Sequence, residues 1–74
     1  MTLRTYLSGH SIHTTIRLYV KDEGFVAEEQ IKNLTTVYDG YEVVKTNPIS
    51  ERNSWFVRKR TGTEYRTLIE VTVE

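Results

Sequence analysis

The chain has 74 residues, in which ten Lys and Arg residues balance ten Asp and Glu residues, and it contains no cysteine. This length predicts a single domain over residues 1–74, and a domain of this size buries only about 60% of the surface that its unfolded chain exposes. The lack of cysteine excludes disulfides, thiolate catalysis and cysteine-ligated zinc.

The first residues lack the apolar stretch of a signal peptide, and no run in the chain approaches the ~18 apolar residues that are needed to cross a bilayer. We therefore expect a cytoplasmic protein with no membrane segment. The balanced charge also gives no dominant positive field of the kind that favours nucleic-acid binding.

The N-terminal third of the chain shows the period-two pattern of strands. Residues 11–21 alternate, with Ile12, Thr14, Ile16, Leu18 and Val20 on one side and His13, Thr15, Arg17, Tyr19 and Lys21 on the other. This pattern predicts a half-buried strand. Residues 3–7 alternate more weakly, and Ser8-Gly9-His10 could turn that segment back as an N-terminal hairpin.

A change of period follows residue 24. Ala27, Ile31, Leu34 and Tyr38 fall at i, i+4, i+7 and i+11, which is the spacing of one helical face. Acidic residues near the start of this segment suit the positive end of a helix dipole, and Gly40 suits a C-terminal cap. The spacing predicts a helix over residues 25–38.

The second half of the chain predicts three further strands. Residues 41–46 form one, which Asn47-Pro48 should stop because proline cannot donate to a ladder, and residues 49–54 form a polar loop. Residues 55–60 and 64–73 form a hairpin. A three-residue loop places Trp55 opposite Ile69 in the core and exposes Phe56, whereas a two-residue loop would bury arginines at a cost of several kcal/mol.

The predicted fold is therefore α+β: an antiparallel sheet of four or five strands in the order β(β)αβββ, with one helix packed on one face. Its predicted core consists of apolar side chains from the helix and from three strands. They are Ile16, Leu18, Ile31, Leu34, Trp55, Ile69 and Val71.

One helix covers one face of a sheet, so the other face should meet water or a partner. The predicted registers place cations and aromatics together on that face. The candidate partner-binding residues are Arg17, Tyr19, Phe56, Arg58, Arg60 and Arg66. Guanidinium groups bind carboxylates or phosphates, and aromatic rings pack on a partner. The alternative is an ordinary solvated face with cross-strand ion pairs.

A second candidate surface is the predicted helix, around which carboxylates gather. The residues are Asp22, Glu23, Glu28, Glu29 and Asp39. They fit either an ordinary solvated helix or an acidic face presented to a basic channel.

Catalytic patterns are weak. His10 and His13 have a spacing that could serve a metal, but no carboxylate is placed beside them, and no phosphate-cradling glycine loop is present. We therefore predict no catalytic residue, no cofactor and no metal. A small metal- or histidine-dependent enzyme is the third hypothesis for function.

The run from Ala27 through Tyr38, followed by Gly40-Tyr41-Glu42-Val43, resembles the helix-then-GYEV-strand pattern of several tiny phage-encoded proteins, some of which bind and inhibit host enzymes. The resemblance implies a stand-alone accessory protein that acts by docking. It transfers no functional residue.

These observations favour a small non-catalytic protein-binding module, such as a phage or mobile-element accessory or inhibitor protein, with an acidic protein surface as its partner. The alternative is a nucleic-acid-binding domain that uses the same cations together with Lys59. Pairing of open faces or edge strands into a homodimer is a further expectation.

Overall fold

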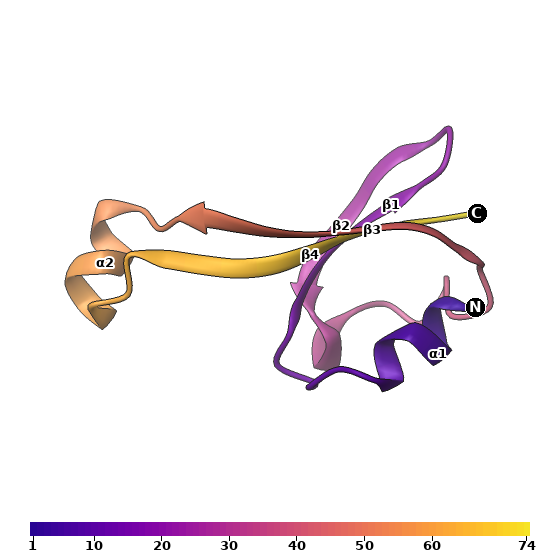
Figure 1. Ribbon diagram of the computed structural model, residues 1–74, viewed down its shortest axis with the longest axis horizontal. Helices are drawn as coiled ribbons and strands as arrows, with labels where there is room; N and C mark the ends of the chain where they lie inside the picture. Colours follow the sequence, from indigo (N-terminus) through magenta and orange to yellow (C-terminus); the bar gives the residue numbers. More distant parts are fainter.

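The computed structural model describes residues 1–74 and shows an α+β arrangement in which four strands form one sheet (Figure 1). In chain order the elements are α1 (Leu3–Ser8), β1 (Thr15–Val20), β2 (Gly24–Gln30), the 3-10 turn η1 (Ile31–Asn33), β3 (Val43–Arg52), α2 (Trp55–Thr61) and β4 (Tyr65–Val73). Neither helix has the length or apolar composition of a membrane-spanning helix.

The sheet has the strand order β2-β1-β4-β3 and is mixed. The outer pairs β1–β2 and β3–β4 are antiparallel, whereas β1 and β4 at the centre run parallel. The prediction of a small α+β protein with a sheet of four or five strands is confirmed, since the sheet has four. The purely antiparallel sheet and the order β(β)αβββ are wrong, because two hairpins join side by side through their most apolar strands.

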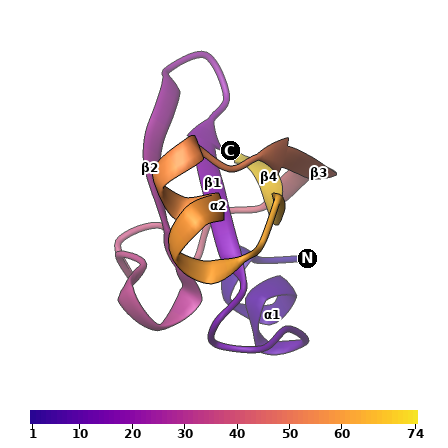
Figure 2. The ribbon, with the colours of Figure 1, turned by 90° about the vertical axis from the view of Figure 1, so that its left-hand side faces the viewer.

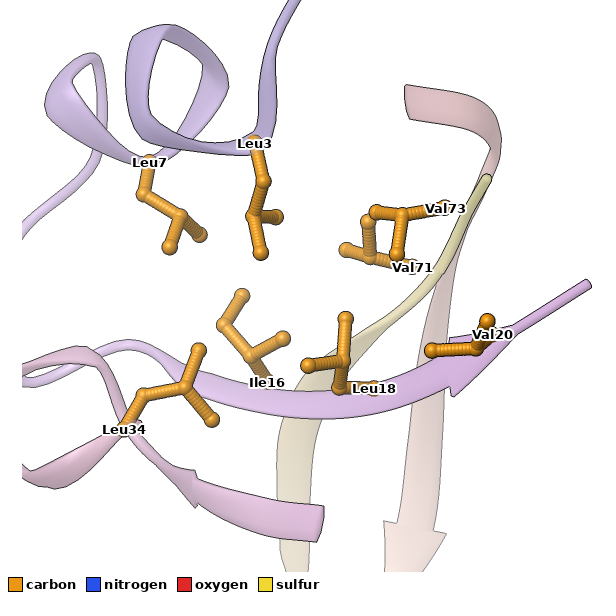
Figure 3. Close-up of a cluster of buried hydrophobic side chains, with 8 residues drawn as sticks. All are labelled: Leu3, Leu7, Ile16, Leu18, Val20, Leu34, Val71 and Val73. Atoms are coloured by element: carbon orange, nitrogen blue, oxygen red, sulfur yellow. The ribbon is translucent and has the colours of Figure 1, made fainter. Parts of the chain in front are cut away.

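The core lies between α1 and one face of the sheet (Figure 3). Its eight buried side chains are Leu3, Leu7, Ile16, Leu18, Val20, Leu34, Val71 and Val73. Of the predicted core residues that this cluster lacks, Ile31 and Ile69 pack against it, half-buried. Trp55 is 56% exposed, so its assignment to the core is wrong.

The predicted N-terminal strand is a helix instead. Leu3 and Leu7 satisfy a four-residue spacing as well as an alternation, and the helix directs both toward the core. Thr2 caps the helix, since its hydroxyl accepts a hydrogen bond from the Thr5 N–H at 3.3 Å. This cap favours the helix, with its four-residue spacing, over the strand that the alternation predicted.

The helix predicted over residues 25–38 is replaced by β2, η1 and a loop. Asp22 and Gly24 have positive φ angles of 68° and 96°, and these close a tight turn that pairs β2 with β1. A bulge follows, because Leu18 pairs with Ala27 whereas Tyr19 pairs with Phe25. The bulge and the 3-10 turn thus allow the residues spaced like one helical face to reach the core without forming a helix. These residues are Ala27, Ile31, Leu34 and Tyr38.

β3 runs through Pro48, where the sequence predicted a strand end and a loop. Because β3 is an edge strand, the N–H that proline lacks would have pointed away from the sheet, and Pro48 pairs with Ile69 without disrupting the ladder. The strand therefore continues to Arg52.

The β3–β4 hairpin extends beyond the rest of the sheet. The pairing of β1 with β4 begins at Ile16 and Ile69, so the first residues of β4 have only β3 beside them. We call residues 49–68 the arm; it projects from the body with α2 at its end, and the molecule is 39 Å long (Figures 1 and 2). The strand predicted over residues 55–60 is wrong, since that segment is α2.

Candidate functional site

The six predicted partner-binding residues fall on two separate surfaces. Arg17, Tyr19 and Arg66 lie on the sheet face opposite α1: Arg17 and Tyr19 alternate with the buried residues of β1, and Arg66 contacts Glu28 and Glu51, the carboxylates that also bind Arg17. Phe56, Arg58 and Arg60 lie on α2, outside the sheet. The structure therefore does not bring these six residues together on one basic face.

The open sheet face is built around Arg17, which contacts a carboxylate on each of the other three strands. Its guanidinium bonds Glu28 of β2 at 2.6 Å and Glu51 of β3 at 2.5 Å, and lies 3.5 Å from Glu70 of β4. Arg66 approaches the same cluster, at 3.3 Å from Glu28 and 3.4 Å from Glu51. The cations of this face are thus neutralised within the molecule.

This arrangement shifts three pKa values. The hydrogen bond that Arg17 donates to Glu28 lowers the pKa of Glu28, and the two bonds that Arg17 donates to Glu28 and Glu51 raise the pKa of Arg17 further above its already high value. Burial raises the pKa of Tyr19, whose hydroxyl also donates to Glu70 at 3.0 Å. The face holds fixed charge pairs that link four strands, so its cations are already engaged within the sheet.

The tip, residues 53–63, is organised by capping hydrogen bonds. Ser54 accepts a bond from the Val57 N–H at 3.4 Å, and Gly62 ends α2 in the left-handed region at φ 74°, with its N–H bonded to the Arg58 carbonyl at 2.8 Å. Asn53 closes the base, since its N–H bonds the Glu64 carbonyl at 2.8 Å. No residue of α2 is buried, so local bonds hold this helix in place of core packing.

Aromatic side chains cover the surface of the tip. Trp55 is 56% exposed and Phe56 is 71% exposed, and their rings meet edge to face with centroids 5.2 Å apart. The Lys59 ammonium lies 4.8 Å from the centre of the Trp55 ring. Val57 and Tyr65 are also exposed here. Large apolar groups are displayed on an element that adds nothing to the core.

The tip carries three cations and no carboxylate. Arg58, Lys59 and Arg60 take part in no ion pair, unlike Arg17 and Arg66. Arg58 is half-buried and donates to the Asn53 carbonyl at 3.1 Å, so it supports the tip. Lys59 and Arg60 are exposed and free to meet a partner.

Reasoning from the sequence placed Trp55 and Val57 on the core face and so missed them as surface residues. The signals were Ser54 and Gly62, which stand where a helix cap and a left-handed C-terminal residue are expected. The apolar run of residues 55–57 instead led to the prediction of a strand.

The histidines do not form a shared site. His10 Nδ1 lies 3.1 Å from the Tyr6 carbonyl and its ring packs on the Tyr6 ring, whereas His13 is exposed on the loop before β1. No three His, Asp or Glu side chains converge in a geometry that could hold a metal ion. A shallow groove beside α1, lined by Leu7, His10 and Leu34 among others, is a surface depression.

Comparison with family models, curated proteins and solved structures finds no significant match to this chain. The functional assignment therefore rests on the geometry of the tip and of the open face.

Proposed function

We propose that this protein is a small non-catalytic binding module that docks its helical tip onto an acidic surface of a protein partner. The observation that carries this proposal is the exposed Trp55–Phe56 pair beside unpaired Lys59 and Arg60. Tryptophan and arginine dominate the binding energy of protein interfaces, because a large ring is desolvated and a guanidinium makes charge-assisted bonds.

The tip has the shape of a docking element. It stands at the far end of a two-stranded arm, so it can enter a groove without the body of the protein interfering (Figure 1). Its caps fix the helix before binding, which lowers the entropy lost on association. The open sheet face contributes less to this proposal, because a partner would have to displace the carboxylates that already hold Arg17 and Arg66.

A nucleic acid is the competing partner, since aromatic rings and cations also bind single strands. The balance of charge favours a protein: the tip is basic, but the chain has no net charge to attract an extended polyanion. The resemblance to phage proteins adds no support, because it required a helix over residues 27–38 that the structure replaces with β2 and η1.

The test is capture by the immobilised chain from a cell lysate, with and without nuclease treatment. We expect a protein that is retained by the wild type and lost from the double variant Trp55→Ser/Phe56→Ser. The matched control is Ile12→Ser/Val37→Ser, which removes two equally exposed apolar side chains away from the tip. Retention that survives the tip substitution contradicts the proposal, and retention that nuclease abolishes favours the nucleic acid.

The purified partner can then be titrated while the emission of Trp55 is followed, because Trp55 is the only tryptophan of the chain. We expect Arg60→Ala to weaken binding by about 1–3 kcal/mol and Arg60→Lys to restore only part of this, since a point charge cannot reproduce a bidentate fork. Arg58→Ala is a less selective probe, because it also removes the bond to Asn53.

A further inference from the structure

The charges of the molecule are separated along its long axis. The tip has three cations and no carboxylate. The opposite end, where both termini lie (Figure 1), has four carboxylates and one lysine, from the β1–β2 turn, the start of β3 and the C-terminus. We call this second surface the acidic end; it consists of Lys21, Asp22, Glu23, Glu42 and Glu74. Its side-chain charge is −3 against +3 at the tip.

Backbone hydrogen bonds bring the acidic end together from three parts of the chain. The Lys21 N–H bonds the Val73 carbonyl at 2.8 Å, and Glu42 and Glu74 exchange two bonds of 2.9 Å. Lys21 lies 3.3 Å from Glu74, and the Met1 amine lies 2.8 Å from Glu42. Asp22 and Glu23, in the β1–β2 turn, form no ion pair.

Exposed apolar side chains also gather at the two charged ends of the molecule, the tip and the acidic end. Ten large apolar residues are exposed, and four of them, Trp55, Phe56, Val57 and Tyr65, lie at the tip or its base. Four others border the acidic end: Met1, Phe25, Tyr41 and Val44. Each charged surface is thus accompanied by apolar groups that a complementary surface could cover.

We infer that the acidic surface on which the tip docks is the acidic end of a second copy of this chain, so that the protein associates head to tail. The inference rests on the proposed function, because both use the tip. Equal and opposite charge at the two ends favours this orientation over tip to tip or end to end. The contact leaves one tip and one acidic end free, so further copies can add.

The association should be weak, because a tip of this size buries less area than a standard interface. We expect sedimentation from about 10 µM to about 1 mM to show a mean mass that rises steadily and does not stop at the dimer. The emission of Trp55 should shift to shorter wavelength over the same range, because docking removes its ring from water. Raising the salt to about 0.5 M should reverse both changes.

Charge exchange provides the decisive test. The tip-reversed variant Lys59→Glu/Arg60→Glu has two acidic ends, and the end-reversed variant Glu23→Lys/Glu74→Lys has two basic ones. Each alone should need at least ~10-fold higher concentration to associate, and an equimolar mixture should associate again, because every contact in it joins opposite charges. The control Arg4→Glu/Lys32→Glu reverses two exposed cations that form no ion pair and should associate like the wild type.

Carboxylates near the C-terminus of α2 oppose the helix dipole, so Lys59→Gln/Arg60→Gln provides a neutral second variant, which should also lose association. A wild type that stays monomeric up to about 1 mM overturns the inference. A mean mass that stops at the dimer, in the wild type and in both reversed variants, also overturns the inference, since it indicates pairing of edge strands. If the monomeric chain still captures a partner through Trp55 and Phe56, only this inference fails; if capture is also independent of the tip, the proposed function fails with it.

Discussion

The body of this protein and the tip of its arm are stabilised by different means. In the body, α1 and the sheet enclose eight buried apolar side chains, so its order comes from removing apolar surface from water. In the tip nothing is buried, and capping bonds hold α2 while its aromatic residues face solvent. The comparison shows that large apolar residues of this chain are either buried in the core or exposed on the tip, and that the sequence alone does not distinguish the two.

The largest expected effect is in the body. Leu18 is fully buried between α1 and the sheet, so Leu18→Ala should lower the free energy of unfolding by about 2–5 kcal/mol through lost burial and the cavity left behind. Urea denaturation measures this change. A midpoint equal to that of the wild type would mean that the core is not where the structure places it.

A smaller effect is expected at the cap of the tip. Gly62 has a φ of 74°, which places a Cβ in an unfavourable position, so Gly62→Ala should cost about 1 kcal/mol and loosen α2 locally. Hydrogen exchange of the α2 amides should become faster while the amides of β1 keep their protection. Equal acceleration in both regions would show that the tip and the body unfold as one unit.

The ion-pair cluster predicts an effect confined to acid. Because Arg17 lowers the pKa of Glu28 in the folded state, the stabilisation is complete above the unfolded value of about 4.3 and is lost as the pH falls through the lower folded value. The melting temperature of Glu28→Gln should therefore fall less between pH 7 and pH 3 than that of the wild type.

Glu29→Gln is the matched control, since this neighbouring glutamate of β2 is exposed and forms no ion pair. It should retain the pH dependence of the wild type. If the two variants behave alike, Arg17 does not stabilise the sheet through Glu28.

The smallest expected effect on stability is at Phe56. This ring is exposed, so Phe56→Ser should change the free energy of unfolding by no more than about 0.5 kcal/mol. The same substitution should weaken partner binding. A thermal melt and a binding assay on the same variant test the two expectations together. A large loss of stability would mean that Phe56 stabilises the fold, which would contradict its assignment to a binding surface.

The elements that the sequence predicted best have a local and unambiguous pattern. In β1, Ile16, Leu18 and Val20 alternate with polar residues, and the structure buries all three. In β4, the alternation of Val71 and Val73 has the same outcome. On the face that meets α1, the pleat therefore determines which side chains enter the core, although β4 also buries Leu68 on the opposite face.

The candidate site could be predicted only in part, because its character depends on contacts between distant residues. The exposure of Trp55 follows from the extension of β3 and β4 beyond β1, which no local pattern encodes. One of the three carboxylates around Arg17 is Glu51, which the sequence placed in a loop because Pro48 was expected to end the preceding strand. Parallel pairing of β1 and β4 is likewise a property of the whole chain.

That central parallel pair has a consequence for how the chain folds. Ile16 pairs with Ile69, so the middle of the sheet joins segments from near the two ends of the sequence, while each outer hairpin forms from neighbouring residues. Closing so long a loop costs entropy before any contact repays it, so this pairing should form more slowly than either hairpin. During synthesis, β1 therefore leaves the ribosome with one edge unpaired, and that edge acquires its partner only when the final strand has emerged.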